Sequence, residues 1–225
     1  MRSFAAVIFV LSASVVSATT IVSTFGSGRT FDNTSGGGLN VGTYSVAVSF
    51  TPSGTVQFGS VDIAAFTMLP QMPPAADLVV SLVADSNGTP GTALESFHFA
   101  EASIPEPTGG CVPCGPSLSG TIVTGTSVLN PTLLAGTQYW IEVGSPGDAS
   151  GYSYIWNHNS LSPQRTGVEA FENGSWTFEA NIATPAFDVN SLDSGTVPEP
   201  AAGVLFGAGL LALAAMRKRL PARRA

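Results

Sequence analysis

The clearest pattern along this chain is an alternation of apolar and polar residues with a period of two. Between residues 43 and 51, Tyr44, Val46, Val48 and Phe50 share one parity, and serine, alanine and threonine take the other. Successive side chains of a strand point to opposite faces of a sheet. The spacing therefore predicts a β-strand with one buried face.

Similar short runs recur along the chain, separated by turns rich in Gly, Pro, Asn and Ser. The predicted strands are 55–68 with a bulge at Gly59-Ser60, 77–84, 94–100, 121–129, 137–143, 152–156, 169–171, 176–179 and a last one around Phe187 and Val189. No segment between the two ends of the chain keeps a 3.6-residue apolar period. About ten short strands predict an all-β fold, a single antiparallel β-sandwich that is jelly-roll-like, over residues 19–190.

The N-terminus has the organisation of a secretory signal peptide. Arg2 provides a positive start, Phe4–Val16 is apolar, and small residues precede Thr19. This order predicts a signal peptide over residues 1–18 and export of the mature chain.

The C-terminus carries a second apolar segment with different flanks. Val197, Pro198, Glu199 and Pro200 precede the uncharged stretch 201–216, and five basic residues follow before the end of the chain. A helix of that length spans roughly 24 Å, a little less than the roughly 30 Å hydrocarbon core of a bilayer. The sequence predicts a linker over 191–196 and a tail over 197–225 with a transmembrane helix at 201–216, its basic end cytoplasmic.

This order of turn motif, short apolar helix and basic cluster resembles the PEP-CTERM sorting signal of Gram-negative, exopolysaccharide-producing bacteria. The resemblance implies an exosortase as partner, with processing near Pro198-Glu199-Pro200. It also implies transient residence in the inner membrane, followed by release to the outer surface or the extracellular space. The alternatives are a plain C-terminal anchor and a buried core helix.

The predicted domain itself resembles the choice-of-anchor R domain. The matching residues are Leu78–Leu82, the Asp85–Gly91 turn, Leu94, Leu133–Gly136, Tyr139-Trp140, Tyr154–Trp156, Trp176 and Ala186-Phe187. The resemblance implies a secreted, surface-associated β domain, and it supplies no catalytic residues.

Charge narrows the classes of partner. Of the eight basic residues only Arg29 and Arg165 lie between Thr19 and Pro200, whereas all fifteen acidic residues do, so the exported part carries a net charge of −13. This charge argues against nucleic acid as a partner because phosphate binding needs clustered Arg and Lys. The scattered acids indicate a solubilising surface and are compatible with neutral polysaccharide.

Cys111 and Cys114 are the only cysteines. Pro and Gly surround them and no helical pattern follows, unlike a thioredoxin-like site, and residue 115 is Gly rather than the His of a haem-attachment motif. In an exported protein the spacing predicts a disulfide that closes a small loop.

Histidines and acidic turns offer little for catalysis or metal binding. His98 lies in a predicted strand and His158 in a predicted loop over 157–164, and no G-x-S-x-G motif occurs. Asp85-Ser86-Asn87-Gly88 resembles the start of a calcium loop but lacks its later glutamate, so a tight turn is favoured. We expect no cofactor, no metal and no catalytic residue.

An aromatic run remains as a candidate binding surface. Tyr152, Tyr154 and Trp156 share one strand face, with Asn157 beside them. Exposed, they would stack on sugar rings; buried, they would fill the core, and the large area of three rings favours the buried arrangement.

Three hypotheses for function follow. The first is an exported, exosortase-sorted component of the cell surface or extracellular matrix, without catalytic activity and tied to exopolysaccharide or biofilm. The second is a carbohydrate-binding module for the producer's exopolysaccharide, and the third is a hydrolase.

Overall fold

A computed structural model describes residues 18–40, 44–67, 77–104, 120–144, 152–161, 168–172, 175–179 and 183–192, all within one compact unit, Ala18–Leu192. The described residues form the strands β1 (Thr20–Ser23), β2 (Phe31–Asn40), β3 (Tyr44–Phe50), β4 (Val56–Thr67), β5 (Leu78–Ser86), β6 (Thr89–Phe99), β7 (Thr121–Thr126), β8 (Thr132–Leu133), β9 (Tyr139–Gly144), β10 (Tyr152–Asn159), β11 (Val168–Glu172), β12 (Ser175–Glu179) and β13 (Phe187–Ser191), and one 3-10 helix, η1 (Glu101–Ser103). The predicted cleavage segment before Ala18, the cysteine pair and the tail 197–225 lie outside these residues.

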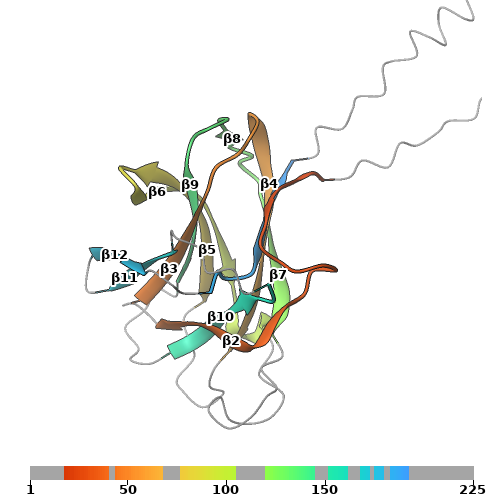
Figure 1. Cartoon of the computed structure of the whole chain (residues 1–225), viewed down its shortest axis with the longest axis vertical. Coiled ribbons are helices and arrows are strands. Elements are labelled where there is room, and N and C mark those ends of the chain that lie inside the picture. The colour runs from red at the N-terminus through yellow and green to blue at the C-terminus, as the bar shows by residue number, and fades with distance from the viewer. Residues whose placement is uncertain are drawn as a thin grey trace, which may run out of the picture. The chain divides into compact units, whose positions relative to one another are not determined.

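The strands build two antiparallel sheets (Figure 1). One sheet has the order β1-β13-β4-β10-β2, and β7 and β8 also pair with β4. The other has the order β12-β11-β3-β9-β5-β6. The prediction of an all-β, antiparallel fold is confirmed.

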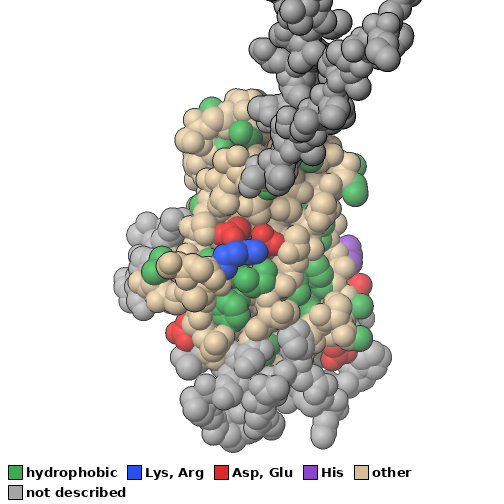
Figure 2. Space-filling model, turned by 90° about the vertical axis from the view of Figure 1, so that its right-hand side faces the viewer, with side chains coloured by type: hydrophobic (Ala, Val, Ile, Leu, Met, Phe, Trp, Pro, Cys, Tyr) green, Lys and Arg blue, Asp and Glu red, His purple; other side chains and the backbone are tan. Residues whose placement is uncertain are grey.

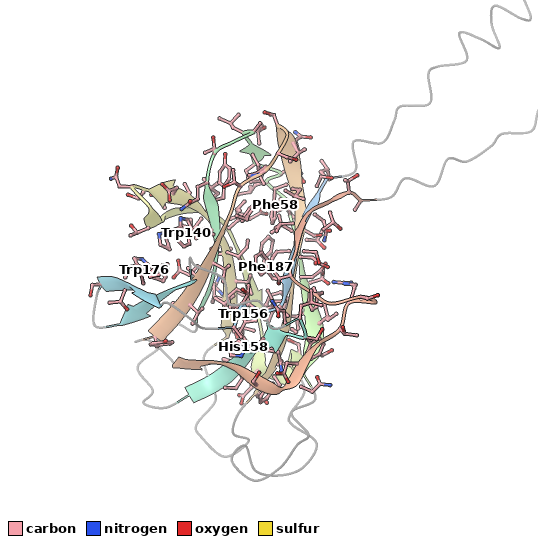
Figure 3. The ribbon with its side chains drawn as sticks, in the orientation of Figure 1. Phe58, Trp140, Trp156, His158, Trp176 and Phe187 are labelled. Atoms are coloured by element: carbon pink, nitrogen blue, oxygen red, sulfur yellow. The ribbon has the colours of Figure 1, made fainter. Side chains whose placement is uncertain are left out.

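A single large apolar cluster lies between the two sheets and draws on both of them. Its fully buried members include Phe58, Ile63, Leu82, Ile141 and Phe187, and Figure 3 shows Phe58, Trp156 and Phe187 pointing into the space between the sheets. Burial of this area is the main stabilising contribution to such a fold.

Strand β4 pairs with β13, β10, β7 and β8 in the larger sheet, and it contains the predicted bulge. The pairing with β13 shifts between Asn190, opposite Ser60, and Ser191, opposite Phe58, so that Gly59 has no partner residue. A Cβ atom at Gly59 would lie 2.4 Å from the backbone nitrogen of Leu192. Only glycine fits there, which confirms the bulge.

Strand β10 is longer than predicted. Residues 157–159 belong to the strand, so the prediction of a loop from residue 157 is wrong there. The peptide N–H of Ala186 donates to the carbonyl of Asn157 at 2.8 Å, and the N–H of Asn159 donates to the carbonyl of Thr184 at 2.8 Å. These long-range backbone bonds stabilise a polar Asn-His-Asn sequence whose local pattern indicates a loop.

The end of β13 also differs from the prediction. Ser191 is the last residue of the strand rather than the first of the linker, and its N–H and hydroxyl both donate to the carbonyl of Thr19, at 2.9 and 3.0 Å. Within the described residues no helix is long and apolar enough to cross a membrane, and the predicted span at 201–216 lies outside them.

Candidate functional site

The aromatic residues of β10 fill the core. Tyr154 and Trp156 have no exposed surface, and the indole N–H of Trp156 donates to the carbonyl of Ala186 at 2.9 Å. Burial, with the charges of Glu101 and Asp77, raises the pKa of Tyr154 to about 12. A ring that solvent does not reach cannot stack on a sugar.

Asn157 is fully buried as well, and its side-chain amide donates to the carbonyl of Asp32 at 3.1 Å. The sugar platform of Tyr154, Trp156 and Asn157 is therefore wrong for these three residues, and the favoured core arrangement is confirmed for the two rings. The side chain of Tyr152 lies outside the described residues.

Both edges of β10 are paired, with β4 on one side and β2 on the other. Ile155 is buried too. A Cβ atom at Gly36 of β2 would lie 2.3 Å from the Cγ2 atom of Ile155, so β2 reaches this position only because glycine has no side chain. Alternation alone could not reveal this close approach between β2 and β10.

A histidine, a serine and an aspartate do meet where β2 pairs with β10. The hydroxyl of Ser35 donates to Oδ2 of Asp32 at 2.6 Å, and Nδ1 of His158 lies 3.2 Å from the same hydroxyl oxygen. Desolvation lowers the pKa of His158, and the charge of Asp32 opposes this. His98 lies elsewhere, with Nδ1 3.9 Å from Oδ2 of Asp77.

The order of these groups differs from a catalytic triad. In a triad the serine proton goes to histidine, whose other nitrogen binds the carboxylate. Here the Ser35 proton goes to Asp32, so His158 donates through Nδ1, while its Nε2 is buried without a hydrogen-bond partner. The cluster ties β2 to β10 and leaves the serine without a histidine base.

A second polar cluster lies on the outer face of the seven-stranded sheet. Arg29 pairs with Oδ2 of Asp62 at 2.9 Å and with Oδ2 of Asp188 at 3.2 Å, and its guanidinium carbon lies 5.4 Å from the ring centre of Phe25. Asp62 and Asp188 face each other on β4 and β13, and we call them the acidic pair. Figure 2 shows a basic group in contact with two groups of acidic atoms on this face.

Most carboxylate oxygens of the acidic pair have hydrogen-bond or ion-pair partners. Asp62 accepts from the hydroxyl of Thr124 and, at 3.0 Å, from the side-chain amide of Asn190. Oδ1 of Asp188 is buried without a partner. Burial raises the pKa of Asp188, and the Asp62 charge adds to this, while Ser23 and Arg29 oppose it. Sequence reasoning missed this cluster, although the scarcity of basic residues in the exported part was a signal.

The outer face of the six-stranded sheet is different. Ala47, Val83 and Trp140 form a small buried cluster against which Trp176 of β12 packs, and Figure 3 shows both tryptophans on this side of the domain. Two residues after Trp176, and therefore on the same strand face, Phe178 is 54% exposed.

Polar groups accompany these rings. Glu142 of β9 lies between Ala47 of β3 and Ser81 of β5. Burial raises the pKa of Glu142, and a hydrogen bond from Ser45 opposes this. We call Trp176, Phe178 and Glu142 the aromatic face. It combines ring surfaces with a hydrogen-bonding carboxyl group, as polar ligands with apolar faces require.

The Asp85 turn has its carboxylate occupied by protein donors. The indole N–H of Trp140 and the amide of Gln138 donate to Oδ1, both at 2.9 Å, and the N–H of Gly88 donates to Oδ2 at 3.1 Å. Asn87 and Gly88 have φ of +56° and +89°, as a tight hairpin requires. The favoured tight turn is confirmed, and among the described residues no group of three or more His, Cys, Asp and Glu could hold a metal ion.

Comparison with known families identifies the tail. Residues 196–219 match the PEP-CTERM protein-sorting motif, and the predicted processing motif Val197–Pro200 falls inside this range. No curated protein matches the chain. The motif implies recognition by exosortase during sorting, and it implies export with a C-terminal sorting signal that anchors the protein transiently in the membrane.

Proposed function

We propose that the chain is a non-catalytic component of the cell surface or extracellular matrix, tied to exopolysaccharide or biofilm, with a choice-of-anchor-like β domain. The observation that carries the proposal is the sorting motif, which starts at residue 196, close behind the last residue of the compact unit, Leu192. A domain followed at once by a sorting signal is suited to delivery at the surface.

Sorting is tested in the native host with and without its exosortase. Mass spectrometry of the mature protein should find a C-terminus near Pro198-Glu199-Pro200 when the enzyme is present, and cell fractionation should place the product on the surface or in the matrix. Recovery of chains ending at Ala225 in the presence of exosortase would contradict the proposal.

The absence of catalysis is supported by the proton arrangement at Ser35, whose hydroxyl donates to Asp32. The full chain should not react with a fluorophosphonate probe. Labelling that Ser35→Ala abolishes, while the protein stays folded, would identify a nucleophile and favour the hydrolase hypothesis instead.

Glycan binding is a second candidate, and the aromatic face favours it. Phe178 is more than half exposed on the strand face that also bears Trp176, and Glu142 offers a hydrogen-bonding group on the same side of the sheet. A surface protein tied to exopolysaccharide would use such rings to stack on sugars.

The test is retention of the full chain on the host's polysaccharide. Phe178→Ala should weaken retention, whereas Leu161→Ala, which removes a side chain of similar exposure (61%) outside this face, should not. Equal retention of both variants and the parent chain would exclude the aromatic face as the glycan site.

A further inference from the structure

The two termini of the domain leave it at one place. Strand β1 begins beside the end of β13, with Thr20 opposite Asn190, and Ser191 donates to the carbonyl of Thr19. Leu192 follows and donates its N–H to the carbonyl of Gln57 at 2.7 Å, at the start of β4. Figure 1 shows these strand ends side by side. We call this region the exit end.

The exit end stays close to any membrane that holds the tail. Eight residues, Asp193 to Pro200, separate Leu192 from the apolar stretch. Fully extended, they span at most about 26–29 Å. While the sorting signal is in the bilayer, the exit end therefore remains within this distance of the lipid surface.

Exposed apolar side chains gather around the exit end. Val128 is 82% exposed, Leu129 67%, Leu134 53% and Leu192 37%. Gln57 and Gly59 of β4 connect them, because Leu192 bonds to Gln57, β8 pairs with Gln57 just before Leu134, and Ser127 donates to the carbonyl of Gly59 at 2.8 Å. We call Val128, Leu129, Leu134 and Leu192 the exit rim.

A buried carboxylate fixes the most exposed part of this rim. Glu95 is 7% exposed and accepts from the hydroxyl of Ser127 and from the N–H groups of Val128 and Leu129, at 2.7 and 3.2 Å. Surface turns are usually polar. Here a turn is held by three hydrogen bonds while its two outward side chains are Val and Leu.

Among the described residues, Asp85 and Glu95 lie toward the exit end, and each accepts three hydrogen bonds. Asp77 and Glu101 lie at the other end of the β5–β6 pair. On the face seen in Figure 2 the acidic atoms lie in the middle and lower parts, and the described atoms visible in the upper part are apolar or neutral. An acidic domain can approach a bilayer most easily through such an end.

We propose that the exit rim is a membrane-contact surface, which inserts Val128 and Leu129 into the interface of the bilayer that holds the tail. The partner is the lipid surface itself, and the contact orients the domain for as long as the sorting signal is anchored. The inference rests on the membrane-anchored tail of the proposed function. Apolar side chains that enter the headgroup region add binding to a chain that is already tethered.

Hydroxyl-radical footprinting of the full chain in phosphatidylcholine vesicles tests the proposal. Leu129 and Leu161 have the same chemistry and similar exposure in the domain, 67% and 61%. Membrane contact should make oxidation of Leu129 severalfold slower than oxidation of Leu161. Equal rates in chains that float with the vesicles would overturn the inference while leaving the anchored tail intact.

Two further outcomes also count against it. If the chain does not float with vesicles, the tail fails as an anchor and the inference fails with it. If the protection of Leu129 grows with the number of chains per vesicle and vanishes at low density, the rim binds a second copy of the chain rather than lipid.

A matched pair of variants completes the test. The double variant Val128→Ser/Leu129→Ser keeps the backbone N–H groups that bind Glu95, so the turn should persist, and amide exchange at these residues checks this. In the double variant, Leu134 should be oxidised severalfold faster than in the parent chain. Leu161→Ser should leave the oxidation rate of Leu134 unchanged. Unchanged protection of Leu134 in the double variant would overturn the assignment of Val128 and Leu129.

Discussion

On the outer face of each sheet, carboxylates bind a residue next to or within an aromatic group, but the electrostatic surroundings of these carboxylates are opposite. On the seven-stranded sheet, Arg29 joins the acidic pair to the segment that carries Phe25. On the six-stranded sheet, Asp85 accepts the indole N–H of Trp140. The carboxylates of the acidic pair are buried against a sheet face, whereas the carboxylate of Asp85 stays exposed to solvent.

The two carboxylates respond accordingly. Burial raises the pKa of Asp188, whereas the hydrogen bond from Trp140, with further bonds from Gly88 and Gln138, lowers the pKa of Asp85. Donors that favour the charged form dominate where water remains, and desolvation dominates where it does not. The seven-stranded face should therefore depend much more strongly on its counter-charge.

Removing that counter-charge is the most severe test. Arg29→Ala leaves two carboxylates facing each other on β4 and β13 with only 8% of each side chain exposed. We expect a loss of about 2–3 kcal/mol in the free energy of unfolding, below the 3–5 kcal/mol typical of fully buried pairs because the arginine itself is half exposed. Urea denaturation of the exported protein measures it.

A second substitution distinguishes repulsion from lost packing on Phe25. Arg29→Ala combined with Asp188→Asn removes one of the facing charges, so it should recover most of the lost stability. If the double variant is as unstable as Arg29→Ala alone, Arg29 stabilises the protein mainly by packing on Phe25. The electrostatic difference between the two faces would then be wrong.

The alternation of apolar and polar residues predicted the strands that bury one face against the core. In β3 and β9 the apolar parity matches the core, with Val46, Val48 and Ile141 inside. The pattern fails for β2, whose sequence has no alternation. Gly36 is required there by the close approach to Ile155, and local periodicity does not record such a requirement.

The candidate sites depended even more on long-range pairing. The phase of Tyr154 and Trp156 was predictable, but the burial of Ile155 on the opposite face of the strand was not. Arg29 and Asp188 are far apart in sequence and meet through sheet order alone. Serine, histidine and aspartate were recognisable as residue types, whereas the donor order at Ser35 needed coordinates.

Trp140→Phe tests the six-stranded face with a smaller expected effect. Phenylalanine keeps most of the buried ring and loses the N–H that donates to Asp85. We expect a loss of about 1–2 kcal/mol in unfolding free energy, since the freed carboxylate is solvated. NMR titration should show the pKa of Asp85 rising toward its ordinary value, and an unchanged pKa would mean that Gly88 and Gln138 carry the shift.

The smallest expected effects are in the dependence of stability on pH, and their signs are opposite on the two faces. Because the pKa of Asp188 is raised in the folded state, that state takes up a proton first as pH falls from neutrality toward about 4, so Asp188 adds stability over this window. Because the pKa of Asp85 is lowered, the unfolded state takes up a proton first below about 4, so Asp85 removes stability there. Relative to the parent chain, Asp188→Asn should lose the gain on acidification, and Asp85→Asn should resist the loss at lower pH. Denaturation midpoints measured across these two pH windows test both expectations. If the midpoints of both variants follow the same pH dependence as those of the parent chain, the two faces do not differ electrostatically.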